Sequence, residues 1–88
     1  MMTPAQSRAA RGLLGWTQAD LAGAAKVGVV TVRQFESGNA EPRNATLTVL
    51  TSALEGAGVI FIAENGEGPG VRLRKERPTA PSEVDGQL

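Results

Sequence analysis

The 88-residue chain carries nine basic and nine acidic side chains, so its formal net charge at neutral pH is zero. This length allows one small domain, whose core must be built mainly from Ala, Val, Leu and Ile, because the chain has one Trp, two Phe and no Tyr. Cysteine and histidine are absent. Their absence excludes disulfides, thiolate catalysis and the commonest metal ligands, and we expect neither an enzyme nor a bound metal or cofactor.

The first predicted helix begins after Thr3. Thr3 and Gln6 have the spacing of a capping box, and the proline between them stands at the first helical position. The glycine at position 15 is expected to end the helix. Trp16 then follows, and we expect it to pack as a hydrophobic staple beside the next helix. The apolar face of the first helix would consist of Ala9, Ala10, Leu13 and Leu14.

Residues 17–38 predict two short helices joined by a tight turn. Thr17 is expected to cap the first of them, with Asp20 three residues later. The second is expected over residues 29–37, with Gly28 as its N-cap and Gly38 as its stop. The small side chain of Ala22 would lie where the two helices come closest. Inward-facing apolar residues recur at helical spacings, namely Leu21, Ala25, Val27, Val32 and Phe35.

A fourth helix is predicted over residues 44–56, after a loop in which Pro42 disfavours helix at Glu41. Each fully buried side chain contributes about 1.5 to 3 kcal/mol, so a core of this size is barely sufficient once chain entropy is subtracted. The shortfall favours additional burial by oligomerisation. The predicted core consists of Leu13, Leu21, Val27, Val32, Phe35, Leu47, Leu50 and Leu54.

The pattern changes to a β-hairpin over residues 58–76. Four β-branched or aromatic residues occupy positions 59–62, a turn-forming cluster occupies 65–70, and polar and apolar residues alternate over 71–75. A lone hairpin leaves its apolar face and its edges uncovered, so we expect it to pair with the hairpin of a second subunit. Residues 77–88 lack the apolar content to fold and are expected to be disordered.

Charge and hydropathy indicate the cellular setting. Residues 1–45 hold five basic and three acidic side chains, a net +2, whereas residues 78–88 hold two acidic and no basic side chains. The acidic tail therefore offsets the net positive charge of residues 1–45 in the formal total. No apolar run approaches the length of a membrane span, and the N-terminus lacks the pattern of a secretion signal. We therefore expect a cytoplasmic protein with no membrane partner.

Residues 18–37 resemble the DNA-binding helix-turn-helix of the Cro and phage-repressor type, also called XRE-like. With its flanking helices the resemblance spans residues 3–56. It implies a mainly α fold, in which residues 1–57 form a four-helix lambda-repressor-like domain. The dimerising β-hairpin predicted over residues 58–76 and the disordered tail predicted over residues 77–88 follow this domain. The residues that carry it are Gln18, Leu21, Ala22, Val27, Val32, Phe35, Glu36 and Gly38, followed by Pro42.

In this motif the second helix of the pair enters the major groove and its first residues meet base edges. The resemblance implies that Gln18 binds a backbone phosphate, and that Arg11 and Glu36 form a structural ion pair. It also places Val29, Val30, Arg33 and Gln34 at outward positions; Arg can bind guanine, Gln adenine and valine the thymine methyl group. The predicted DNA-binding residues are Thr17, Gln18, Gly28, Val29, Val30, Thr31, Arg33, Gln34, Asn39 and Arg43.

Each of these residues also has an ordinary structural interpretation. Gln18 and Gln34 could be solvated helix residues, and Arg33 could pair with a nearby carboxylate. Asn39 and Arg43 could belong to a polar loop that ends in a helix cap at Asn44. Adjacent valines at 29 and 30 cannot both face the core of a small helix pair, so at least one should be exposed.

The chain departs from the family at two places. Lys26 stands in the turn, where relatives often have glycine, so a left-handed backbone there would carry a strain of roughly 1 kcal/mol. The recognition helix opens with Gly28, Val29 and Val30 in place of the polar pair of many relatives. Specificity would then depend more on methyl contacts and DNA shape.

The resulting hypothesis is a sequence-specific transcription regulator, most simply a repressor, that binds double-stranded DNA as a homodimer on a near-palindromic operator. Two alternatives remain. An antitoxin would bind its own promoter and hold a toxin as a protein partner. A protein-interaction module would use the exposed valines against another protein and would not bind DNA.

Overall fold

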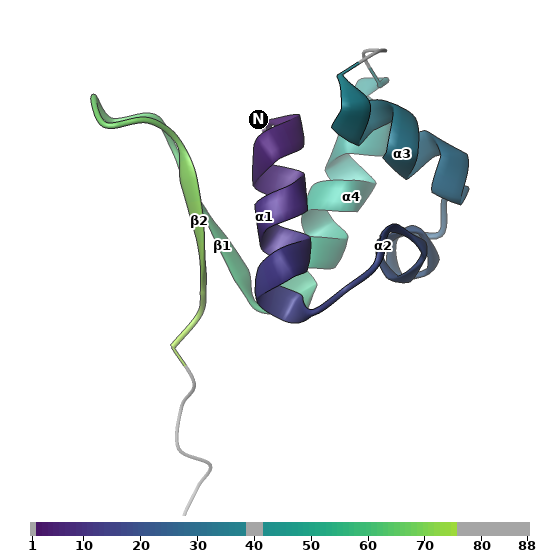
Figure 1. Cartoon of the computed structure of the whole chain (residues 1–88), viewed down its shortest axis with the longest axis horizontal. Coiled ribbons are helices and arrows are strands. Elements are labelled where there is room, and N and C mark those ends of the chain that lie inside the picture. Colours follow the sequence, from purple (N-terminus) through teal and green to yellow (C-terminus); the bar gives the residue numbers. More distant parts are fainter. Residues whose placement is uncertain (1, 39–41, 76–88) are drawn as a thin grey trace, which may run out of the picture.

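The computed structural model describes residues 2–38 and 42–75. Four helices are followed by a two-stranded antiparallel hairpin, which confirms the predicted mainly α fold (Figure 1). The predicted disordered tail and Asn39 lie outside the described residues. The elements are α1 (Pro4–Leu14), α2 (Gln18–Ala25), α3 (Val29–Ser37), α4 (Asn44–Gly56), β1 (Val59–Ile62) and β2 (Gly70–Leu73).

Local capping chemistry sets where the first two helices begin. The Thr3 hydroxyl accepts the Gln6 backbone N–H at 3.1 Å, and the Gln6 side chain accepts the Thr3 N–H at 2.9 Å. Thr17 and Asp20 repeat this reciprocal pattern at 3.0 and 2.9 Å at the start of α2. Both caps satisfy amides that a helix start would otherwise leave unpaired, and both were predicted from the sequence.

Helix α4 spans Asn44–Gly56, as predicted. The N-cap is Arg43, and no side chain of residues 2–38 or 42–75 forms a capping hydrogen bond at the helix start. The alternative interpretation of Asn44 as the helix cap is wrong, because the extended backbone that an N-cap requires falls one residue earlier, at φ −67° and ψ 155° of Arg43. Asn44 is thus the first residue of the helix itself.

The turn between α2 and α3 is tight and strained. Lys26 ends α2 with φ 60° and ψ 44°, and it is the one residue other than glycine with positive φ among those described. A side chain in this left-handed conformation costs roughly 1 kcal/mol or more. The turn is held by the Lys26 and Val27 backbone N–H groups, which donate to Gly23 and Ala22 carbonyls at 3.3 and 3.0 Å.

The core lies among the four helices and extends to the hairpin. Leu13, predicted to belong to it, is 44% exposed, so that prediction is wrong. In α1 the buried position is Ala10, and Leu14, four residues on, packs against the core in place of Leu13. Two members lie outside the helices and were not predicted, Met2 and Val59. The buried apolar residues are Met2, Ala10, Leu21, Ala22, Ala25, Val32, Phe35, Leu50, Leu54 and Val59.

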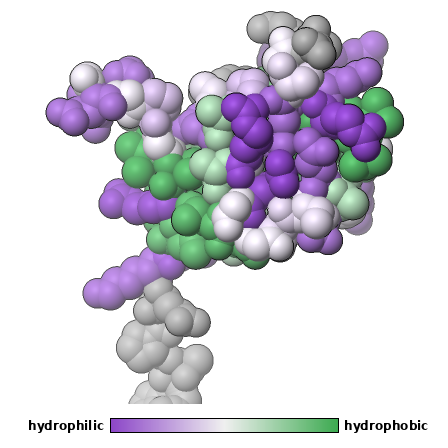
Figure 2. All heavy atoms as spheres, viewed as in Figure 1, coloured by the Kyte–Doolittle hydropathy of each residue, from purple (hydrophilic) through white to green (hydrophobic). Residues whose placement is uncertain are grey.

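The hairpin packs one face against the helices. Its register pairs Val59 with Leu73 and Phe61 with Val71, and these four side chains share a face because opposite residues of an antiparallel pair point the same way. Val59 is buried, and Phe61 and Val71 pack against the core. Figure 2 shows apolar atoms gathered where the hairpin meets the helical body.

One side chain of α1 anchors the hairpin at its far end. Gln6 is 6% exposed, and its Nε2 donates to the backbone carbonyls of Gly70 at 2.9 Å and Ile62 at 3.4 Å. The opposite end is closed by the Arg74 N–H, which donates to the Gly58 carbonyl at 2.6 Å. The hairpin is therefore fastened to α1 on the side away from α3 (Figure 1).

Candidate nucleic-acid interface

Helix α3 has one buried and one exposed side. Val32, Phe35 and Glu36 are buried. The exposed residues recur at helical spacing on the opposite side, and they form a continuous outward stripe. We call this set the α3 stripe; its members are Val30, Arg33, Gln34 and Ser37.

The two valines that open α3 take different environments. Val30 is 52% exposed, whereas Val29 is half-buried and packs against the core. The prediction that Val29 occupies an outward position is therefore wrong. Val29 lies three residues before buried Val32, which places both on the same side of the helix. Thr31 is also half-buried, and Gly28 is the exposed N-cap.

Arg33 and Gln34 stand at the outward positions that were predicted for them. Both are exposed. No carboxylate among the described residues pairs with Arg33. The ion pair that the structure records joins Arg11 and Glu36. The guanidinium of Arg33 thus remains available to a base or a phosphate as far as the described part of the chain goes.

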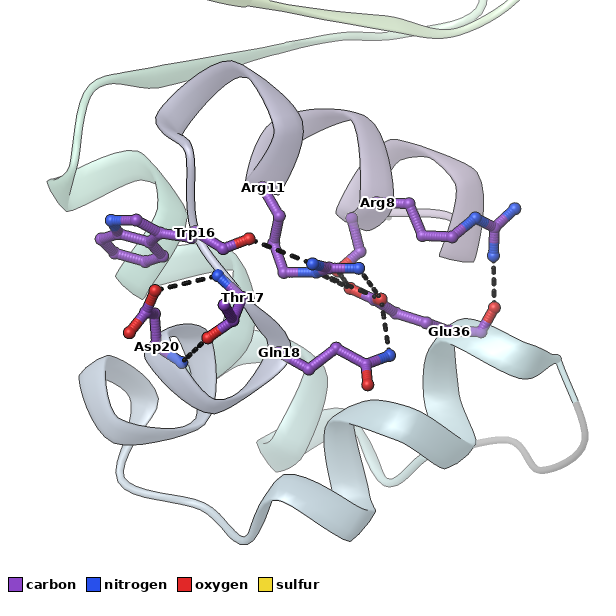
Figure 3. A network of polar contacts seen from close by, with 8 residues as sticks. Arg8, Arg11, Trp16, Thr17, Gln18, Asp20 and Glu36 are labelled. Carbon is purple, nitrogen blue, oxygen red and sulfur yellow. Dashed lines mark hydrogen bonds and ion pairs between the residues drawn. The ribbon is translucent and has the colours of Figure 1, made fainter.

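A buried carboxylate behind the α3 stripe joins three helices (Figure 3). Glu36 is 3% exposed. It accepts from Arg11 Nη2 at 2.7 Å and Nε at 2.9 Å, from Ser7 Oγ at 2.5 Å and from Gln18 Nε2 at 3.1 Å. The predicted structural ion pair of Arg11 and Glu36 is confirmed. Residues of α1 and α2 thereby fix the last turn of the recognition helix.

The donors around Glu36 keep it ionised. Burial alone raises the pKa of this carboxyl, but the hydrogen bonds from Arg11, Ser7 and Gln18, together with the Arg11 charge, outweigh burial and lower the pKa below its ordinary value. Glu36 in turn raises the pKa of the Arg11 guanidinium. Arg11 also donates from Nη1 to the Trp16 carbonyl at 3.1 Å, which ties the end of the α1–α2 connection to the same group.

Gln18 and Thr17 lie at the N-terminus of α2, beside this network (Figure 3). Gln18 is half-buried, and one of its two Nε2 hydrogens goes to Glu36. The second is the hydrogen that a phosphate oxygen could accept. Thr17 is exposed and serves as the N-cap of α2. The sequence alone did not reveal the contact between Gln18 and Glu36, because it depends on how the two helices cross.

Two arginines flank the C-terminal end of α3 and the start of α4. Arg43 is exposed at the N-cap of α4, next to the end of the described segment. Arg8, which was not among the predicted site residues, is exposed and donates from Nη1 to the backbone carbonyl of Glu36. Its signal in the sequence was its position three residues before Arg11, on the same side of α1.

The described residues offer no site for a metal, since they contain no group of three or more carboxylate, cysteine or histidine side chains that could hold one. A groove of about 440 Å³ lies between the start of α1, α4 and the hairpin. Its charged lining residues are the carboxylates Glu55 and Glu64, without a basic side chain. This groove is therefore unsuited to a phosphate backbone.

No helix in residues 2–38 and 42–75 has the length and apolar character needed to cross a membrane. No curated protein matches the sequence. A family model described as helix-turn-helix matches residues 8–56, more than half of the 88-residue chain. The matched segment contains α2, α3 and three members of the network around Glu36, namely Arg11, Gln18 and Glu36 itself. The chain therefore belongs to the XRE-type helix-turn-helix family of Cro and phage repressors, whose members are DNA-binding regulators of transcription.

Proposed function

We propose that this protein is a sequence-specific transcription regulator, most simply a repressor, that binds a near-palindromic operator as a homodimer. The observation that carries the proposal is the α3 stripe, an outward row of four side chains on a helix whose other side is buried. The N-terminal residues of such a helix meet base edges when the helix enters the major groove.

The α3 stripe offers three kinds of base contact. The Val30 methyl groups suit the methyl group of thymine, and Gln34 can bind adenine through both of its amide atoms. Arg33 can bind guanine in bidentate fashion or a phosphate. Val29 contributes to this surface only at its edge, since it packs against the core. Three residues with different base preferences are enough to distinguish operators.

Phosphate contacts would flank this reading surface. Gln18 and Thr17 lie at the start of α2, Arg43 lies at the start of α4, and Gly28 exposes the N-terminus of α3. Helix N-termini and arginine side chains both attract phosphate groups. Asn39, outside the described residues, belongs to the same proposal. Because arginine contacts release counterions from DNA, affinity should fall as the salt concentration rises.

The hairpin supports the proposal of a dimer. Ile60 is 36% exposed on the face of the hairpin that points away from the helices, and Leu73 is 43% exposed at the end of β2. In the described part of the chain, no further strand flanks either edge of the two-stranded sheet, and an open edge favours pairing with another strand. A second copy of the hairpin on the outward face would cover Ile60 and would relate two recognition helices by a twofold axis.

Selection of bound duplexes from random DNA tests the proposal. We expect an enriched motif of two inverted half-sites whose centres are about 34 Å apart, or a multiple of that distance. Gel-shift measurement of the enriched duplex should then show lower affinity at higher salt. Failure to enrich any sequence, with affinity that stays flat from low to moderate salt, would overturn the proposal.

A further inference from the structure

We infer that Glu36 is a positioning residue for DNA binding: its buried carboxylate orients the Gln18 amide so that a hydrogen of Nε2 faces the phosphate backbone. This inference rests on the proposed function, because it deepens the phosphate contact assigned there to Gln18. It gives a residue of the family's structural ion pair a second role, which is to set the direction of a hydrogen-bond donor.

The chemistry of the two groups permits one orientation of the amide. An ionised carboxylate accepts hydrogen bonds and donates none, whereas a glutamine amide has a donor end and an acceptor end. Gln18 must therefore present Nε2 to Glu36, and the distance from Nε2 to Glu36 Oε1 is 3.1 Å. The reversed amide would place two oxygens against each other. The carboxylate thus determines which atom of Gln18 lies beside it.

Glu36 can orient Gln18 because Glu36 is itself immobile. Arg11 binds both of its carboxylate oxygens, and Ser7 binds Oε2 at 2.5 Å. The side chain of Glu36 is 2% exposed, and that of Arg11 is 17% exposed. The Gln18 side chain is then already ordered in the free protein, so less conformational entropy is lost when the phosphate binds.

The same contact links the phosphate donor to the reading helix. Glu36 lies in the last turn of α3, on the side opposite the α3 stripe, whereas Gln18 is the first residue of α2. A donor held by α3 keeps a fixed position relative to Val30 and Gln34, so the phosphate and base contacts share one register. Phosphate contacts that fix register in this way position a protein on the duplex without specifying sequence.

A double-mutant cycle tests this role, with the tightest duplex from the random-sequence selection as the probe. The variant Arg11→Met with Glu36→Leu removes the carboxylate and its counterion together, since replacing both members of a buried pair by apolar groups often preserves the fold. Gln18→Ala removes the donor. We expect Gln18→Ala to weaken binding roughly tenfold in the parent protein, and about threefold or less in the apolar-pair variant.

Ser7→Ala is the matched control. It removes one donor from Oε2 but leaves Arg11 on both carboxylate oxygens, which still fixes Glu36 and its contact with Gln18. Ser7→Ala should therefore lower the melting temperature and leave DNA affinity within about twofold of the parent. Equal effects of Gln18→Ala in the parent and in the apolar-pair variant would overturn the inference. So would an unchanged affinity in Gln18→Ala. If the parent itself enriches no duplex, the proposed function fails instead.

A second measurement uses the unaltered protein and applies even if the apolar-pair variant does not fold. In a ¹⁵N–¹H spectrum, the two Nε2 hydrogens of Gln18 give separate signals because rotation about the amide C–N bond is slow. In the free protein, the hydrogen that Glu36 accepts should exchange with solvent more slowly than the other. Addition of the selected duplex should shift the other signal. Equal exchange rates of the two hydrogens in the free protein, or signals unmoved by the duplex, would contradict the positioning role.

Discussion

At the scale of single residues, the fold depends on a few side chains whose environment differs sharply from that of their neighbours. Glu36 is a buried acid on a helix whose adjacent residue, Ser37, is exposed. Lys26 occupies a backbone conformation that favours glycine. Glu36 and Lys26 each lead to a prediction about stability that can be checked without DNA.

Glu36 should make stability depend on pH in a defined direction. Its pKa is lowered in the folded protein, so its contribution is complete above the ordinary glutamate pKa of about 4.3, and it is lost as the pH falls through the lower folded-state value. Urea unfolding between neutral pH and pH 2 should show this loss. The loss should be smaller in Glu36→Gln, whereas an unchanged pH dependence in that variant would contradict the assignment.

Lys26 should be replaceable with a gain in stability. Glycine adopts the left-handed conformation without strain, so Lys26→Gly should raise the free energy of unfolding by roughly 0.5 to 1 kcal/mol after the greater entropy of the unfolded glycine is subtracted. Lys26→Ala keeps the strained conformation and should bring no such gain. Equal stability of the two variants in urea denaturation would show that backbone strain at Lys26 does not lower the free energy of unfolding.

At the scale of elements, the helices were predictable and their contacts were only partly so. The caps at Thr3 and Thr17 and the stop at Gly38 are local signals, and each marks the boundary that the structure shows. Membership of the core is not local. Met2 and Val59 lie outside the helices and enter the core through tertiary packing, whereas Leu13 follows the helical pattern and is exposed.

The candidate interface was likewise only partly predictable from the sequence. The exposure of Arg33 and Gln34 followed from helical periodicity, and the family resemblance supplied the ion pair of Arg11 and Glu36. The burial of Val29 and the bond from Gln18 to Glu36 depend on how α2 and α3 cross. A crossing angle is set by the side chains at the contact, and the sequence of one helix does not specify it.

The two sides of α3 should separate function from stability. Val30→Ala and Gln34→Ala remove exposed side chains, so each should weaken binding to the selected duplex by roughly tenfold, about 1.4 kcal/mol, with little change in melting temperature. Val32 is fully buried, and Val32→Ala should cost about 2 kcal/mol of stability while the folded fraction still binds. Melting curves and gel shifts on the three variants check this division, and a large loss of stability in Gln34→Ala would refute it.

The attachment of the hairpin to α1 can be tested at Gln6. Gln6→Glu keeps an oxygen for the Thr3 amide but loses the donor to the Gly70 and Ile62 carbonyls. Leaving these carbonyls beside a carboxylate should cost on the order of 1 to 3 kcal/mol. Hydrogen exchange should then accelerate in β1 and β2 more than in α2. Uniform acceleration throughout the protein would show that the hairpin has no separate opening reaction.

At the scale of the whole molecule, the hairpin and the recognition helix lie on opposite sides of α1 (Figure 1). The surface proposed for dimerisation is therefore separate from the surface proposed for DNA. Substitutions on the hairpin should alter assembly without touching the α3 stripe, which makes the dimer testable on its own.

Charge on the hairpin should disrupt the proposed dimer. Ile60→Lys would place a cation in the buried interface, and we expect a monomer in analytical ultracentrifugation. Val49→Lys, at a residue of α4 that is 38% exposed, is the matched control and should leave the dimer intact. The monomeric variant should still bind a single half-site weakly. A variant that remains dimeric would place the interface elsewhere.

Consecutive residues of α1 serve the two sides of the molecule. Gln6 holds the hairpin backbone, whereas Ser7 holds the carboxylate behind the α3 stripe. In the proposed dimer, α1 would connect the hairpin, at the twofold axis, rigidly to the recognition helix α3 of the same subunit. One additional base pair at the centre of an operator moves its halves apart by about 3.4 Å and rotates them by about 35°. A rigid connection cannot follow such a movement. The dimer would therefore bind only operators of a single spacer length.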